Sequence, residues 1–285
     1  STNNPKLPNQ ISLIICISSL LFGLVQESYG AIGETLEVTQ FSRLFSLIFI
    51  AALLLATIAT THRLPARVNV KPPNDSDSEN ISIKKIDALI DNRRQVDFHI
   101  MLSMVGLGRS LMSMATHLFM LFVCIELASL SSYILVAFHK ESKIGGEAGM
   151  KYFIVGSVAS AVGIYGMSLL YLWSGDLSLD ALAMKWSESE SVDPLAGIAV
   201  GLMLVAFGFK VGAAPFHLAA PDAYSGASSP VAGLLATASK AMGFVALMRI
   251  LVSVTMPIEG EAFWYTAIAV IAVVTMTWGN LAALT

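Results

Sequence analysis

Eight stretches of this sequence are long and apolar enough to cross a membrane. Each runs for about 20 residues with few charged side chains, the length that an α-helix needs to span a hydrocarbon core of about 30 Å. The stretches lie at residues 10–26, 41–61, 99–115, 118–138, 148–173, 195–217, 227–253 and 262–284. We therefore predict an all-α fold, a polytopic membrane helix bundle of about eight transmembrane helices. The first stretch is also short enough for a signal peptide, but Gln26 and Glu27 make a poor cleavage context.

The composition supports this class and excludes others. Hydrophobic residues make up 55% of the 285 residues and charged residues only 13%, about half the charged share of an average soluble domain. These values argue against a water-soluble enzyme and a disordered chain, and the net charge of −3 without a basic patch argues against nucleic-acid binding. The two cysteines, Cys16 and Cys124, stand alone in apolar stretches and are expected to be small buried hydrophobes rather than metal ligands.

The basic residues of the connections predict the orientation. Lysine and arginine gather in residues 62–98 and 139–147, whereas the connections at 27–40, 174–194 and 254–261 are acidic. By the positive-inside rule, the N-terminus, the two basic connections and the C-terminus face the cytoplasm or the mitochondrial matrix.

The connection 62–98 is the only sizeable polar insertion. Its stretch 72–80 is too polar to order by itself, so we predict a surface loop. Residues 81–97 have the apolar spacing of a short amphipathic helix on the membrane surface, although a plain linker fits nearly as well.

Three charged residues lie deep inside the apolar stretches. Counting about 1.5 Å per residue puts Glu126, Lys210 and Lys240 at least about 8 Å from either surface of the core. Arg109 and Arg249 lie nearer the ends of their stretches. A charge at the centre of a membrane helix costs at least about 2.5–3.5 kcal/mol, so such residues usually line a polar cavity, a partner interface or an ion path.

Buried residues of mixed sign suggest a proton route. Desolvation lowers the proton affinity of a lysine and a nearby carboxylate raises it, so a small change in the Lys–Glu distance can load or release a proton. Arginine is unsuited to this task because its guanidinium keeps its proton. A static pair between Glu126 and a lysine, which would only hold helices together, is the alternative interpretation.

The segment after Lys210 predicts a broken helix. Pro215 cannot donate a helix hydrogen bond and crowds the carbonyl of Val211, and Pro221 follows six residues later. Irregular backbone at membrane depth occurs only where protein buries it or where it lines a water-filled cavity. The combination of Lys210, this break and His217 therefore favours an ion path, although His217 alone could equally be a buried structural histidine.

The order of several motifs resembles subunit 2, called subunit N in bacteria, of respiratory complex I, NADH:ubiquinone oxidoreductase. The likeness runs from about residue 100 to the C-terminus. It rests on Phe209-Lys210-Val-Gly-Ala-Ala-Pro215-Phe216-His217, Pro221-Asp222-Ala-Tyr224-Ser-Gly226, Ala236-Thr237-Ala238-Ser239-Lys240, Met248-Arg249, Ile125–Tyr133, Met150–Phe153, Ser174–Ser178 and Gly279–Leu281. The chain departs from the family pattern at Arg109, His117, Ala219 and Ser225.

The resemblance implies roles for particular residues. Glu126 would be the glutamate of the antiporter-like fold, Lys210 the lysine on the broken helix and Lys240 the central lysine of the next helix, with His217 and Lys151 in or near the same polar axis. These five residues are the candidates for proton translocation. The resemblance implies no redox chemistry, cofactor or metal in this chain, and flavin and iron–sulfur clusters elsewhere in the complex.

Hydropathy and the resemblance together give a domain organisation. Hydropathy and charge make residues 1–61 N-terminal transmembrane helices and 62–98 a matrix- or cytoplasm-facing loop. The resemblance implies that 99–253 form the first antiporter-like five-helix repeat and 254–285 the start of the next region. The family fold has two inverted repeats, so we expect a fragment of a split subunit whose second half is a separate polypeptide.

The other expected partners are the remaining membrane-arm subunits and lipids. The many Ala and Gly residues favour a nuclear-encoded protein of the mitochondrial inner membrane, with a bacterial cytoplasmic membrane as the alternative. The function could instead be that of a cation/proton antiporter subunit or a related membrane-bound oxidoreductase, a structural membrane subunit with an inert polar axis, or a solute transporter of unrelated fold.

Overall fold

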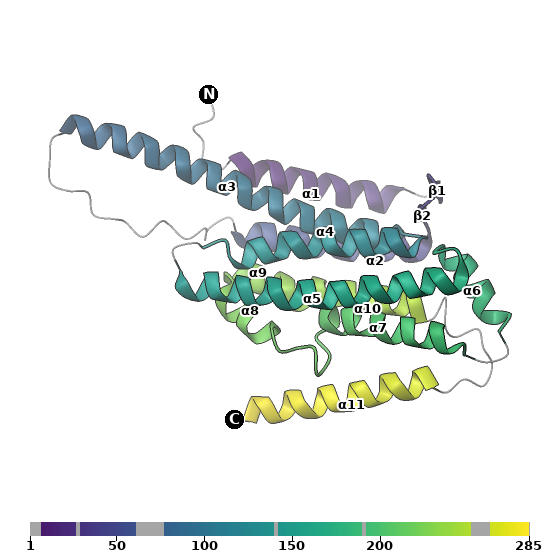
Figure 1. Ribbon diagram of the computed structural model, residues 1–285. Coiled ribbons are helices and arrows are strands. Elements are labelled where there is room, and N and C mark those ends of the chain that lie inside the picture. Colours follow the sequence, from purple (N-terminus) through teal and green to yellow (C-terminus); the bar gives the residue numbers. More distant parts are fainter. Residues whose placement is uncertain are drawn as a thin grey trace.

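A computed structural model describes residues 7–26, 29–60, 77–139, 142–189, 192–251 and 263–284, with the side chains of 77–92, 263, 264 and 283 left aside. Residues 62–76 of the expected loop and the expected junction at 253–254 lie outside this part of the chain. The described residues form a bundle of roughly parallel and antiparallel helices (Figure 1). The predicted fold class, a polytopic bundle of membrane helices, is confirmed.

Seven helical segments of the described part are long and apolar enough to cross a membrane. Six of them are single helices and the seventh is a rod that joins α9, η1 and α10. Their bounds are α1 Leu7–Val25, α2 Gln40–Thr60, α4 Leu118–Val136, α5 Lys143–Ser174, α7 Pro194–Val211, α9 Ser229–Leu234, η1 Leu235–Ser239, α10 Lys240–Ile250 and α11 Phe263–Leu284.

The eighth predicted span, 99–115, is the C-terminal part of a longer helix. Helix α3 runs from Asp77 to Met114, so one helix continues across the expected boundary at 98–99, and residues 81–97 are helical. The chain has no proline or glycine between Asp77 and Val105 that could interrupt the helix. The end of α3 packs against α2 and α4, and His99 and Arg109 make it more polar than the other spans.

The connections sort to the two ends of the bundle as predicted from their charges. The connection between α4 and α5 lies at the same end as the C-terminus, and the β-hairpin and α6 lie at the other end (Figure 1). The hairpin, which the sequence analysis did not predict, pairs β1 Gly30–Ile32 with β2 Leu36–Val38 in antiparallel register. Gly33 makes its turn possible because its φ of 73° is accessible mainly to glycine.

Helix α6 Leu179–Ser187 is a second element of the acidic end. Ser178 caps it by accepting a hydrogen bond from the N–H of Ala181. The Asp176 carboxylate accepts hydrogen bonds from the N–H of Ser178 at 2.9 Å and from its hydroxyl at 3.1 Å. The backbone hydrogen bond from Ser178 holds the pKa of Asp176 below its usual range, and this fixed turn orients α6 over the bundle.

Two membrane helices differ from the prediction, one in where it ends and the other in its internal geometry. The span expected at 195–217 stops at Val211, because Gly212 adopts a left-handed conformation and caps α7. A short helix, α8 Ala220–Gly226, follows the irregular segment. The span expected at 227–253 contains the π-helical turn η1, which the sequence analysis did not predict. The helix break is therefore confirmed, and it begins three residues before Pro215.

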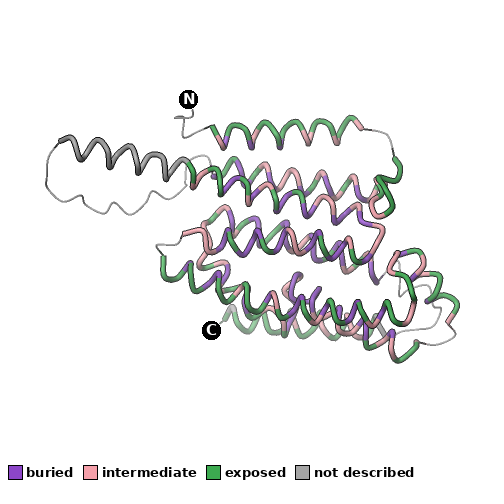
Figure 2. The backbone as a smooth tube through the Cα atoms, turned by 45° about the horizontal axis from the view of Figure 1, so that its top comes forward, coloured by how far each residue is buried: buried purple, intermediate pink, exposed green. Residues whose placement is uncertain are grey.

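Small residues bring the central helices into close contact. Between α5 and α7, Gly163 lies against Ala206 and Gly166 lies against the backbone of Ala199. In lipid such contacts stabilise helix pairs through van der Waals packing. Figure 2 shows that buried residues gather where the central helices face one another, whereas α1 is largely exposed. The best-packed region therefore lies between α3, α4, α5, α7 and α10.

Arg109 is the most unusual residue of this region. It is only 1% exposed, and none of its three guanidinium nitrogens has a hydrogen-bond partner among the described residues. Tyr152 of α5 is close enough for an electrostatic interaction. A buried charge without a partner loses its hydration and gains little in return.

We expect Arg109→Met to raise the free energy of unfolding by about 1–4 kcal/mol, because methionine fills the space without an unpaired charge. Thermal unfolding in detergent measures this through a thiol-reactive dye that labels the buried Cys16 and Cys124 as they become exposed. Arg43→Met is the matched control and should lower the stability, since the Arg43 guanidinium donates to the carbonyls of Gly23 and Leu24. A loss of stability in Arg109→Met would contradict the prediction.

Candidate functional site

A buried ion pair between α4 and α7 forms the centre of the site. The Lys210 Nζ lies 3.1 Å from the Glu126 Oε1. The side chain of Lys210 is 5% exposed and that of Glu126 is 23% exposed. The structure thus brings together two of the three deep charges of the sequence. Because the pair is shielded from water, removing one partner would cost about 3–5 kcal/mol.

Hydroxyl groups complete the surroundings of this pair. The Lys210 ammonium also donates to the Ser129 Oγ at 2.6 Å and to the Tyr133 hydroxyl at 3.5 Å. The Ser160 Oγ of α5 donates to the Glu126 Oε1 at 2.7 Å. Both charges therefore have polar partners besides each other, which offsets part of their desolvation cost. Hydroxyls both donate and accept, so they can also pass a proton along a chain of hydrogen bonds.

The end of α7 determines where Lys210 lies. Lys210 is in the last turn of α7, where the partial negative charge of the helix C-terminus stabilises a cation. The next residue but one, Gly212, has a φ of 80° and ends the helix. Gly243 of α10 packs directly on this turn, because a Cβ at that position would lie 3.0 Å from the Lys210 carbonyl carbon. The missing side chain of Gly243 therefore lets α10 lie close to the end of α7.

Lys240 lies on the other side of the same break. A Cβ added to Gly212 would be 2.6 Å from the Lys240 Nζ, so the ammonium rests against the glycine that ends α7. The Nζ is also 5.9 Å from the ring centroid of Tyr224, a distance typical of a cation–π contact. Within the described ranges the structure records no carboxylate partner for Lys240. Lys240 is therefore half-buried without the counter-charge that Lys210 has.

The π-helical turn η1 ends immediately before Lys240. Such a turn holds one extra residue and is frequent at functional sites. Ser239, the last residue of the turn, is buried, and its side chain lies close to Tyr152 of α5. Tyr152 in turn packs edge-on against Tyr133, with ring centroids 4.7 Å apart. Tyr133, Tyr152 and Ser239 therefore lie near one another between the two lysines, with a hydrogen bond recorded, in the described part of the chain, only from Lys210 to Tyr133.

The other two candidate residues lie outside this group. Lys151 is exposed and forms an ion pair with Glu147 within α5 at 2.7 Å. Its second ion pair, with Asp222 at 3.1 Å, joins α5 to α8. His217 lies between α7 and α8, with its ring 5.9 Å from that of Trp278 on α11. Among the described residues no contact is recorded between His217 and the three deep charges. The structure therefore unites Glu126, Lys210 and Lys240 near one break, with Lys151 and His217 at its edges.

Sequence reasoning missed the hydroxyl groups of the site. Glu126, Ser129 and Tyr133 are spaced at three and four residues, so they share one face of α4, and this spacing could have identified them. Ser160 and Tyr152 carry no such signal, because only the packing of α5 on α4 and α7 brings them to the pair. No cluster of three or more His, Cys, Asp or Glu residues occurs in the described part of the chain.

Comparisons with known proteins agree with this architecture. The family model described as NADH:quinone oxidoreductase/Mrp antiporter, transmembrane region, matches residues 115–285. The NADH-quinone oxidoreductase subunit N of Heliobacterium modesticaldum is 43% identical over 194 residues, which are 67% of this chain and 40% of that protein. The protein of the same name from Desulfitobacterium hafniense is 32% identical over 96% of this chain and 51% of its own length.

A solved structure gives the same result in three dimensions. The chain matches a subunit of respiratory complex I from Thermus thermophilus with a TM-score of 0.73 and 27% identity, over 99% of this chain and 54% of that one. The chain thus spans about half the length of the relatives it matches. Since the family model covers more than half of its residues, this chain belongs to the NADH:quinone oxidoreductase/Mrp antiporter family of membrane proteins.

Proposed function

We propose that this chain is a proton-translocating membrane subunit of a complex of the respiratory complex I type. The observation that carries the proposal is the arrangement around Gly212, where the Lys210–Glu126 pair lies on one side and the Lys240 ammonium on the other. Ammonium groups of lysine can release and take up protons inside a membrane protein, and the break in α7 gives the backbone room to move them.

The mechanism uses the two lysines in different ways. When Glu126 is close, Lys210 holds its proton firmly; when the pair separates, Lys210 loses that stabilisation and can release the proton. The hydroxyls of Tyr133, Tyr152 and Ser239 provide polar groups towards Lys240. Lys240 has no fixed counter-charge, so its ammonium can release its own proton, and the neutral amine can then take up the proton from Lys210. A shift of the α7 end by a fraction of a helical turn would be enough to change the distances.

Lys151 and His217 take part at the edges of this axis. The ion pair of Lys151 with Asp222 fixes α8 to α5, and His217 lies where α11 closes over the break. We propose that these residues carry protons between the buried lysines and the neighbouring parts of the complex. The exposure of Lys151 supports a role in exchange with a partner or with water rather than in storage of a proton.

The redox chemistry would take place in other subunits. The complex as a whole would be a proton-translocating NADH:quinone reductase, with its flavin and iron–sulfur clusters in other chains and no cofactor in this one. Residues 99–253 would correspond to the first five-helix repeat of the antiporter-like fold. The window of α11 that could span a membrane contains no buried residue, which supports partners on that side.

The partners that we propose are other membrane-arm subunits, lipids and the helices of the second repeat. From the sequence, we expect a separate polypeptide to carry the second repeat. The intact mass of this chain in the purified complex tests this expectation, because one continuous chain extending past Thr285 would contradict it. The mitochondrial inner membrane, with the N-terminus on the matrix side, is proposed from composition alone; the relatives reported above are bacterial, and the bacterial cytoplasmic membrane is the alternative.

A cation/proton antiporter subunit is the second candidate, because the matched family includes Mrp antiporters by its description. Co-purification distinguishes the two functions. A complex I-type assembly would bring flavin and iron–sulfur absorbance with this chain, whereas an antiporter would not. Variants of Glu126 and Lys240 distinguish a structural subunit with an inert axis, because such a subunit would keep its rate of proton translocation when these residues are replaced.

We expect Glu126→Gln to lower the rate of proton translocation by at least about tenfold, because each 1.4 kcal/mol lost from the central pair corresponds to a factor of ten. Proton uptake into vesicles that contain the complex measures this. Glu188→Gln removes an exposed carboxylate at the opposite, acidic end and should leave the rate unchanged. Equal rates for both variants would contradict a role of the pair in transport.

Lys240→Arg tests whether this residue releases its proton or only supplies a positive charge. Arginine keeps the charge but does not lose its proton, so we expect Lys240→Arg and Lys240→Met to abolish translocation alike. Assembly of the complex is checked by size-exclusion chromatography. Translocation by Lys240→Arg close to that of the unmodified protein would support an inert structural cation instead.

Gly212→Ala should impair both stability and translocation. A residue with a Cβ costs about 1–2 kcal/mol in the left-handed conformation, and the new methyl group would overlap the Lys240 ammonium. We expect a lower unfolding temperature and slower proton uptake. Gly201→Ala is the control, because a Cβ there meets no atom within 4 Å and the residue lies inside α7. It should lower neither the unfolding temperature nor the rate of proton uptake.

A further inference from the structure

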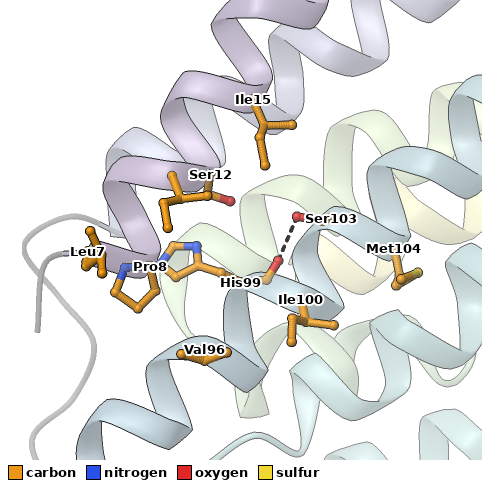
Figure 3. A pocket seen from close by; sticks show the side chains of 10 residues that line it. Leu7, Pro8, Ser12, Ile15, Val96, His99, Ile100, Ser103 and Met104 are labelled. Carbon is orange, nitrogen blue, oxygen red and sulfur yellow. Dashed lines mark hydrogen bonds between the residues drawn. The ribbon is translucent and has the colours of Figure 1, made fainter. Parts of the chain in front are cut away.

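An apolar groove runs between α1 and α3, away from the site described above (Figure 3). Its volume is about 340 Å³, within the range of small-molecule sites. One wall is formed by every fourth residue of α1 and the other by every fourth residue of α3. These residues are Leu7, Ile11 and Ile15 of α1 and Val96, Ile100 and Met104 of α3.

Two buried polar side chains, Ser12 and His99, line this groove. His99 lies between Pro8 and Ser12 of α1 (Figure 3) and is only 5% exposed. Its Nδ1 has no hydrogen-bond partner within the described part of the chain. Such a group is normally satisfied by protein, water or a ligand, so His99 offers an unused hydrogen-bonding point among the apolar walls.

A basic residue lies about one turn before the groove-lining residues of α3. Arg93 lies three residues before Val96 and seven before Ile100, so it continues the same face of α3. It is exposed, whereas the neighbouring Arg94 turns to α4 and donates to the Phe138 carbonyl at 3.3 Å. Arg93 belongs to the end of the bundle where lysine and arginine concentrate. Anionic lipids are attracted to such residues.

We propose that this groove binds an anionic phospholipid. One acyl chain lies between the two apolar walls, the glycerol ester region contacts His99, and the phosphate interacts with Arg93. The six residues from Arg93 to His99 separate them by about 9 Å along the helix, so the two side chains meet different parts of one lipid. The site is independent of the proton-translocating role.

The size of the groove favours a lipid over a protein helix. A helix with its side chains is about 10–12 Å wide, and α1 and α3 already contact each other, so the space between them admits a chain but not another helix. A neutral lipid could pack against the same apolar walls, but its headgroup has no net negative charge for Arg93 to neutralise. The position of the charge therefore supports an anionic headgroup.

Photo-crosslinking in the intact membrane complex tests this site. The complex is placed in phosphatidylcholine vesicles that contain phosphatidylglycerol with a photoactivatable group in its acyl chain, and the labelled peptides are identified by mass spectrometry. We expect label on α1 and on residues 93–104 of α3. Unlabelled phosphatidylglycerol should compete, and the corresponding phosphatidylcholine probe should label these peptides at least about fivefold less.

Variants separate the headgroup contact from the groove itself. Arg93→Gln should lower labelling about fivefold, the value of one basic residue near an anionic surface, and Arg93→Lys should restore it. Lys143→Gln removes an exposed charge from α5 at the same end of the bundle and should have no effect. Ile100→Trp should block the groove and remove labelling while the complex still assembles.

Three outcomes would overturn the proposal. Equal labelling by the phosphatidylcholine probe would show that the charge is irrelevant, and label confined to other helices would show that the groove binds no lipid. A photoreactive amino acid introduced at Ile100 that cross-links to a neighbouring subunit would show that protein covers the groove.

Discussion

The ion pair between Lys210 and Glu126 is the interaction on which the centre of the structure depends. Two charges in a membrane bundle are tolerated only if they meet each other and further polar groups. The pair lies between α4 and α7, and α5 contributes Ser160 to the carboxylate while α4 contributes Ser129 to the ammonium. Three helices are therefore held in one arrangement by a small number of polar contacts in apolar surroundings.

Two irregular backbone segments surround this pair. Helix α7 ends at Gly212, and the π-helical turn η1 precedes Lys240. Regular helices would satisfy their backbone groups internally and leave little freedom at this depth. At the end of α7 the irregularity gives room for Lys240 to approach the break. The two lysines thus differ in environment although they lie near the same glycine: Lys210 has a carboxylate partner, and Lys240 rests near the Tyr224 ring.

Much of the fold could be predicted from the order of apolar stretches, because a membrane helix must satisfy all of its backbone groups within a continuous segment of known length. The errors came where local rules are weak. Hydropathy separated 62–98 from 99–115, although no residue between Asp77 and Val105 breaks the helix. Pro215 indicated the break in α7, but the left-handed Gly212 ends the helix earlier. The hairpin at 30–38 is too short to leave a clear pattern.

By itself, the sequence determined the class of the fold, the sorting of the connections by charge and the three deep charges, because each follows from composition and spacing along the chain. Only the tertiary structure decided which charges meet. It paired Glu126 with Lys210, left Lys240 without a carboxylate among the described residues and brought Lys151 to Asp222 at the surface. Helix packing fixes these distances, and a linear sequence contains no rule for which faces of distant helices come together.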